Sequence, residues 1–239
     1  MAPPVYHYER VASTMDVIHA LAEQGAEAGT IVIAGEQLQG RGSRGRPWHS
    51  PPGGLWMSAL FRPPAAGGVE VVSLRVGLAV APVLDPFAST TVRLKWPNDL
   101  MVGERKLGGI LCEARWQGDV LGWLAVGLGL NLRNSIPAEL RAQATSLADE
   151  QALLDDEKLV DAIIAAIGNL DLRPARLSPA ELDQFAARNW LSGREIREPV
   201  CGTVTGLGND ATLQVRTAEG SSVALRNASI ELAAVSHTT

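Results

Sequence analysis

A loop rich in glycine and arginine, Gly40–Arg46, restricts the folds open to this chain. Its seven residues hold three glycines and three arginines, and they follow Ile31–Ala34, whose composition predicts a strand. The glycines match the spacing G-x-G-x-x-G, but a dinucleotide-binding loop must open a helix, and Pro47 and the run Pro51–Gly54 exclude a helix start there. We therefore predict a loop that binds phosphate or carboxylate oxygens through guanidinium groups instead of a helix N-terminus. The alternative is a solvated basic turn.

The chain as a whole is acidic, so the basic loop is a local feature. Its 239 residues carry a formal net charge of −5, which argues against general nucleic-acid binding and leads us to expect no DNA partner. The two cysteines, Cys112 and Cys201, fit a reducing compartment and give no spacing typical of a metal site. The N-terminus has no apolar signal core, and the longest apolar run, Leu121–Leu130, is too short to span a membrane. We expect a cytoplasmic protein without membrane contact.

Apolar periodicity and turn residues predict an α+β chain with two domains. Strands are expected over residues 5–11, 31–34, 55–62, 92–96, 106–115 and 120–132. Helices are expected over residues 13–25, 71–84, 156–170 and 178–188, and Ser13 and Ser178 supply N-terminal caps. Beyond residue 190, short alternating segments over residues 194–200, 203–207, 212–216, 222–225 and 229–232 predict a small barrel. We place the domains at residues 1–189 and 190–239, and we expect the first to complete its core without the second.

Polar residues near the ends of the expected strands are candidate site residues. Lys106 precedes Gly108 and Gly109, so its ammonium can lie beside a ligand with nothing bulky between them; a solvated lysine is the alternative. Asn131 closes a glycine-containing strand, where it either binds a ligand or caps the strand end. Asp99 lies in a turn and is also a candidate site residue. The alternative is that its carboxylate only bonds to the local backbone.

Four segments in the same order and spacing resemble the biotin protein ligase family. They are Gly40–Trp48, Lys95–Asp99, Lys106–Glu113 and Gly127–Asn131. The resemblance implies a catalytic domain like that of class II aminoacyl-tRNA synthetases, with a mixed sheet and helices, followed by an SH3-like barrel. It also implies a two-step reaction, in which biotin and ATP form biotinyl-5′-AMP and the biotinyl group then moves to a lysine. That lysine would belong to the biotin carboxyl carrier domain of acetyl-CoA carboxylase or a related carboxylase.

The same resemblance implies roles for individual residues. Arg41, Lys106 and a Mg²⁺ ion would neutralise the charge that develops when a carboxylate attacks the α-phosphorus of ATP. Asp99 would steer or deprotonate the attacking lysine, which completes the catalytic set. The residues expected to bind biotin or ATP are Ser13, Thr14, Gln37, Arg41, Gly42, Ser43, Lys106, Gly108 and Asn131.

Two positions depart from the family pattern. Met15 stands where members usually have asparagine, and Ser43 stands where the loop usually has a second arginine. We therefore expect no hydrogen bond to biotin from residue 15 and weaker closure of the loop over the acyl-adenylate. Because the chain begins directly with the expected catalytic domain, we also expect a ligase without repressor function. The alternatives are a lipoate ligase or octanoyltransferase, and a non-catalytic module that uses the arginine loop on nucleic acid.

Overall fold

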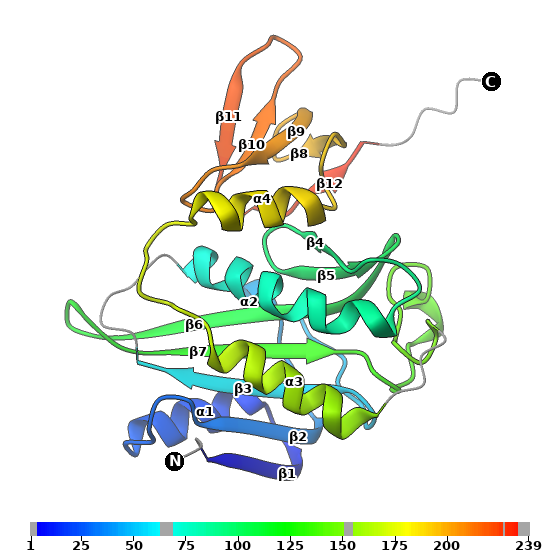
Figure 1. Cartoon of the computed structure of the whole chain (residues 1–239). Helices are drawn as coiled ribbons and strands as arrows, with labels where there is room; N and C mark the ends of the chain where they lie inside the picture. The colour runs from blue at the N-terminus through cyan, green and yellow to red at the C-terminus, as the bar shows by residue number, and fades with distance from the viewer. Residues whose placement is uncertain (1–3, 63–68, 151–154, 227, 234–239) are drawn as a thin grey trace.

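The protein folds into a large mixed sheet with helices on both faces and a smaller sheet near its C-terminus (Figure 1). This computed structural model describes residues 4–62, 69–150, 155–226 and 228–233, so the outer ends of the two expected domains, at residues 1 and 239, lie outside the described residues. The helices are α1 (Thr14–Glu23), α2 (Val69–Leu84), α3 (Asp156–Gly168) and α4 (Pro179–Arg188), with short 3₁₀ turns at Ser43–Gly45, Asp85–Phe87 and Ala138–Leu140. No helix within the described ranges is long and apolar enough to cross a membrane.

The large sheet contains seven strands in the order β1-β2-β3-β7-β6-β5-β4. Their bounds are β1 (Val5–Val11), β2 (Ile31–Gln37), β3 (Leu55–Phe61), β4 (Arg93–Lys95), β5 (Asp99–Val102), β6 (Arg105–Gln117) and β7 (Val120–Leu130). Only β1 and β2 pair in parallel among these strands, and the other neighbours are antiparallel. The mixed sheet with helices confirms the expected α+β class.

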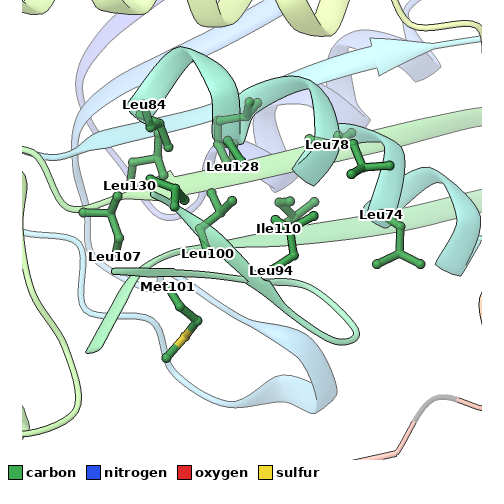
Figure 2. Packing of buried hydrophobic residues seen from close by; sticks show 14 of the residues in the cluster. Leu74, Leu78, Leu84, Leu94, Leu100, Met101, Leu107, Ile110, Leu128 and Leu130 are labelled. Atoms are coloured by element: carbon green, nitrogen blue, oxygen red, sulfur yellow. The ribbon is translucent and has the colours of Figure 1, made fainter. Parts of the chain in front are cut away.

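Strand alternation divides the apolar residues between the two faces of this sheet. On β7, Leu124, Val126, Leu128 and Leu130 belong to a core with α2 and α3, while Trp123 and Ala125 belong to a second cluster with α1. Figure 2 shows the first cluster, where leucines of α2 lie over Leu128, Leu130 and Ile110. Each face of the sheet is therefore closed by helices, and polar side chains are left at the strand ends.

The C-terminal strands form a five-stranded antiparallel sheet in the order β11-β10-β9-β8-β12. They are β8 (Glu195–Glu198), β9 (Gly202–Leu207), β10 (Leu213–Arg216), β11 (Ser222–Leu225) and β12 (Glu231–Leu232). Their apolar residues Val204 and Leu213 join the same cluster as Leu94 and Trp96 of the large unit. The indole Nε1 of Trp96 also donates to the carbonyl of Ala211 at 2.8 Å. Residues of the two sheets therefore belong to one apolar cluster, and a first core that is complete without the second stays a prediction.

Local sequence signals explain most element boundaries. Ser178 accepts from the backbone N–H of Glu181 while the Glu181 carboxylate accepts from the N–H of Ser178, which is the expected capping box of α4. Ser13 caps α1 by accepting from the N–H of Met15. The sequence reading missed β5, because it treats Asp99 as part of a turn and because four residues carry too little alternation to indicate a strand.

Candidate functional site

A cavity of about 490 Å³ collects nearly all of the site residues expected from the sequence. Its lining includes nine of them: Ser13, Thr14, Gln37, Arg41, Gly42, Ser43, Asp99, Lys106 and Asn131. These residues come from the start of α1, the end of β2 and the loop after it, the strands β5 and β6, and the position just after β7, so the sheet brings together segments far apart in the sequence. Met15 also lines the cavity, where its thioether adds an apolar surface.

Gly108 is the exception, since it is not among the lining residues of this cavity. A Cβ atom at this position would lie 2.4 Å from Cδ2 of Leu130 and 2.7 Å from the carbonyl oxygen of Gly129. The glycine is therefore required for close packing of β6 against β7 and does not contact the cavity. Its neighbour Gly109 lines the cavity instead, because successive strand residues point to opposite faces.

One part of the cavity wall is a network of neutral hydrogen-bonding groups around Gln37. Its Oε1 accepts from the backbone N–H of Thr14 at 2.9 Å and from the Thr14 hydroxyl at 3.0 Å. The amide Nε2 donates to Ser50 Oγ at 2.9 Å, and Ser58 Oγ donates to Thr14 Oγ1 at 2.8 Å. Because a backbone N–H can only donate, these contacts fix which way the Gln37 amide points. The Gln37 amide is therefore held in one orientation in the cavity wall.

A second part of the wall carries the pair Lys106 and Asp99. The Lys106 Nζ lies 2.5 Å from Asp99 Oδ1 and 4.9 Å from the ring centroid of Trp48, a cation–π distance. A Cβ at residue 129 would lie 2.6 Å from the Trp48 indole nitrogen, so Gly129 is needed to admit this ring. The Trp48 Nε1 is buried and makes no hydrogen bond within the described part of the chain. An unpaired buried donor beside a cavity is a group that a ligand can satisfy.

Arg41 is held on the cavity wall by two carboxylates. Its Nη1 lies 2.6 Å from Asp16 Oδ1, and its Nε lies 3.2 Å from Glu113 Oε1. Burial lowers the pKa of Arg41, but the hydrogen bonds and charges of Glu113 and Asp16 outweigh it and raise the pKa overall. A hydrogen bond from His19 is the largest cause that moves the pKa of Glu113, which falls to about 2 despite partial burial. The Asp16 carboxylate therefore binds Arg41. It forms no capping-box hydrogen bond at the start of α1.

Asn131 makes local bonds on both sides of its amide. Its Nδ2 donates to the carbonyl of Thr145 at 3.0 Å, and its Oδ1 accepts from Asn134 Nδ2 at 3.0 Å. These contacts fit the alternative role, that of a cap at the strand end, and connect β7 to the loop that follows it. A ligand-binding role for this residue stays a prediction, supported by its place in the cavity wall.

The arginine loop adopts a tight turn and contacts the C-terminal unit. Ser43–Gly45 form a 3₁₀ turn in which Arg44 has a φ of 61°, and no helix follows it, as the prolines predict. The Arg44 guanidinium donates to the hydroxyl of Ser229, next to the last strand β12. Arg46 Nη2 lies 3.5 Å from Ser43 Oγ, which is a weak bond at best.

Two residues that line this cavity, Trp48 and Lys95, were not among the site residues expected from the sequence. Trp48 ends the glycine–arginine motif, and its indole beside Lys106 could not be inferred from spacing alone. Lys95 also lines the cavity, with its Nζ 5.1 Å from the ring centroid of Trp190. Burial is the main cause that lowers its pKa, and the positive charges of Lys106 and Arg46 act in the same direction. A lysine at the end of a short strand carries no signal of this burial in the sequence.

Known proteins with similar sequences fall in one family. The model of the biotin/lipoate A/B protein ligase family matches residues 8–131. The bifunctional ligase/repressor BirA of Bacillus subtilis is 36% identical over 149 residues, which are 60% of this chain and 46% of that protein. The biotin--[acetyl-CoA-carboxylase] ligase of Mycobacterium tuberculosis is 29% identical over 224 residues, covering 87% of this chain and 79% of that protein. The matched stretch spans about half the length of the BirA relatives.

The fold is also similar to that of solved biotin protein ligases. The biotin protein ligase from Aquifex aeolicus, solved in complex with biotin and ATP, superposes with a TM-score of 0.81 and 25% identity. That match covers 96% of this chain and 98% of the other. The matched family model includes more than half of the residues, all four motif segments and every cavity-lining residue up to Asn131. This chain therefore belongs to the biotin/lipoate A/B protein ligase family.

Proposed function

We propose that this protein activates biotin with ATP to biotinyl-5′-AMP and transfers the biotinyl group to a lysine of a biotin carboxyl carrier domain. The observation that carries the proposal is that one cavity holds two kinds of groups. Gln37 and Thr14 offer fixed neutral partners for a ureido ring, and Arg41 and Lys106 offer cations for carboxylate and phosphate oxygens. Similarity over nearly the whole chain to a ligase solved with biotin and ATP supports the same assignment.

The first step joins two anions, the biotin carboxylate and the α-phosphate of ATP. Lys106 and Arg41 lower the repulsion between them and stabilise charge on the leaving pyrophosphate. Lys106 is already paired with Asp99, so substrate oxygens must replace or share that carboxylate. Pyrophosphate leaves as the mixed anhydride forms.

The second step requires a neutral amine from the acceptor lysine. Asp99 is freed when Lys106 turns to the substrate, and it can then orient the incoming ammonium or accept its proton. The amine attacks the acyl carbon of biotinyl-5′-AMP, an amide bond forms, and AMP leaves.

Magnesium fits this site only as an ion held mainly by the nucleotide. No group of three or more histidine, cysteine, aspartate or glutamate side chains in the described ranges is arranged to hold a metal ion. Mg²⁺ commonly uses one or two carboxylates together with substrate phosphates. Asp99 and Glu104 line the cavity and are the carboxylates available for such a contact. When bound, the ion would neutralise phosphate charge.

The finer architecture and the partners belong to the same proposal. We propose that the large unit, residues 1–189, is related to class II aminoacyl-tRNA synthetases and that residues 190–239 form an SH3-like barrel. Five short antiparallel strands support the barrel. We propose a carrier domain of acetyl-CoA carboxylase or a related carboxylase as the acceptor. DNA is not proposed as a partner, in keeping with the net charge of −5, and unpaired Cys112 and Cys201 support a cytoplasmic location.

Pyrophosphate exchange into ATP tests the activation step directly. The full chain should catalyse exchange that depends on biotin and Mg²⁺. Lipoate and octanoate serve as the competing carboxylates, because the family also contains proteins that act on lipoate. Exchange driven by lipoate or octanoate but not by biotin would replace the proposed substrate, and no exchange with any of them would refute the activation step.

A further inference from the structure

A chain of side-chain hydrogen bonds runs from a buried indole to Arg41 in the cavity wall. Trp123 Nε1 donates to His19 Nδ1 at 2.9 Å, and His19 Nε2 lies 2.9 Å from Glu113 Oε2. The other oxygen of Glu113, Oε1, accepts from Arg41 Nε at 3.2 Å. The chain therefore connects β7, α1, β6 and the loop after β2 through four consecutive side chains.

The indole fixes the tautomer of His19. An indole N–H can only donate, so Nδ1 of His19 must accept and carries no proton. The ring proton then lies on Nε2, where it donates to Glu113. A hydrogen on Nδ1 would face the indole N–H of Trp123, so the geometry leaves Nε2 as the ring donor that faces Glu113.

Glu113 divides its two oxygens between the histidine and the arginine. Oε2 accepts from His19, with Arg115 Nη2 a more distant partner at 3.4 Å, and Oε1 accepts from Arg41. Asp16 holds the Nη1 of Arg41 from α1. Nη2 of Arg41 makes no hydrogen bond with the residues that the structure describes, and Arg41 lines the cavity. One side of the guanidinium is thus fixed, and the other remains for an anion.

Packing alone does not explain a histidine at position 19. His19 and Trp123 are each 6% exposed, and they lie beside Ile18 and Ala22 in the apolar cluster under α1. A buried imidazole is costly unless both nitrogens are bonded, whereas an aliphatic residue would fill the same space without that requirement. The protein therefore has a histidine, whose two ring nitrogens need hydrogen-bond partners, at a position where an apolar residue would fill the space.

We propose that Glu113 is a positioning residue for Arg41, and that His19, locked by Trp123, positions Glu113. The inference rests on the proposed function and deepens it, because it assigns orientation of the phosphate-binding guanidinium to residues that do not themselves touch substrate. Trp123, His19 and Glu113 act as one unit that orients Arg41. Loss of any of the three lets the guanidinium leave its fixed direction.

Four single variants test this unit. His19→Leu removes both bonds, and His19→Gln restores one acceptor and one donor. Glu113→Gln offers a single acceptor oxygen where His19 and Arg41 need two. Ile18→Val is the matched control, because it perturbs the same apolar cluster of α1 without a bond to Glu113. All four are measured in biotin-dependent pyrophosphate exchange, with ATP and biotin varied separately.

We expect His19→Leu and Glu113→Gln to lower kcat/KM for ATP by about 10- to 100-fold, the scale of misplacing a positioned group. Biotin binding measured without ATP should stay within about twofold of wild type in both. His19→Gln should recover part of the loss, and Ile18→Val should show none. The double variant His19→Leu/Glu113→Gln should lose no more than the worse single variant, because both act through one unit.

Several results would overturn the proposal. They are unchanged ATP kinetics in His19→Leu, equal losses for ATP and biotin, a loss in Ile18→Val as large as in His19→Leu, or additive losses in the double variant. If the wild type shows no biotin-dependent exchange, the proposed function fails. The ¹⁵N chemical shifts of the His19 ring then test separately whether the hydrogen-bonded unit exists. A proton on Nε2 alone, and loss of that pattern in Trp123→Phe, supports the unit; a proton on Nδ1 refutes it.

Discussion

The Nζ atom of Lys106 lies 2.5 Å from Oδ1 of Asp99 on the wall of the cavity. Each of these residues therefore neutralises the other in the chain without substrates. In the proposed mechanism, a substrate carboxylate or phosphate that binds Lys106 would take it from Asp99 before the acceptor ammonium binds. The pair links the two proposed steps, because the same ammonium that binds the first substrates releases the carboxylate needed for the second.

Replacing Lys106 by alanine tests the first half of this link. We expect Lys106→Ala to lose roughly 2–4 kcal/mol of transition-state stabilisation in adenylate formation, similar to removing one preorganised donor. The side chain contacts Asp99 and Trp48 at the cavity, so the fold should be retained. The measurement is biotin-dependent pyrophosphate release, with circular dichroism as a control for folding. Near-normal release by a folded variant would remove Lys106 from the active site.

Ser43 offers a test of loop closure. An arginine at this position would add charge-assisted bonds worth about 1.5–3 kcal/mol each, whereas the only hydrogen-bond partner of the serine hydroxyl in the described part of the chain is Arg46 at 3.5 Å. We expect biotinyl-5′-AMP to escape from the wild type and to label lysines of a bystander protein that has no acceptor domain. Ser43→Arg should reduce this labelling in a streptavidin assay. Equal and negligible labelling by both proteins would mean that another arginine closes the loop, and Arg44→Ala would be the next variant.

The sequence predicts which residues line the cavity better than it predicts the contacts that hold those residues in place. Cavity residues such as Gln37 and Lys106 could be found because motifs preserve residue type and spacing. The bonds of Asn131, the packing role of Gly108 and the burial of Lys95 depend on which strands become neighbours, and local pattern carries no information about that. Strand β5 was missed because four residues are too few for periodicity, although it supplies Asp99 at the cavity.

Acid titration tests the electrostatic state of Glu113. Its pKa falls from an ordinary 4.5 to about 2, chiefly through the hydrogen bond from His19. A carboxylate with a lowered folded-state pKa stabilises the fold fully above the unfolded value and loses that contribution as the pH falls through the folded value. The free energy of unfolding of wild type should therefore exceed that of Glu113→Gln above pH 4.5, and the gap should close between pH 4.5 and about 2. A gap independent of pH across this window would contradict the ionised state.

The hydrogen bond from Trp96 to Ala211 tests whether the two sheets unfold together. One apolar cluster contains residues from both sides of the expected domain boundary between residues 189 and 190. We therefore expect a single cooperative transition in denaturant. Trp96→Phe should shift that transition by about 1–3 kcal/mol, since it leaves a buried carbonyl without its donor. Two separate transitions, with only one of them sensitive to Trp96→Phe, would instead support the independent cores expected from the sequence. Fluorescence and far-ultraviolet circular dichroism, followed in parallel, distinguish these outcomes.

Mass spectrometry of an acceptor domain tests the central claim most directly. A biotin carboxyl carrier domain is incubated with the full chain, biotin and MgATP, and a second domain with its acceptor lysine changed to arginine serves as the control. The proposed function predicts a mass increase of one biotinyl group on the first domain, located by peptide mapping to the acceptor lysine, and no change in the control. An unmodified domain, or one modified only when lipoate or octanoate replaces biotin, would contradict it.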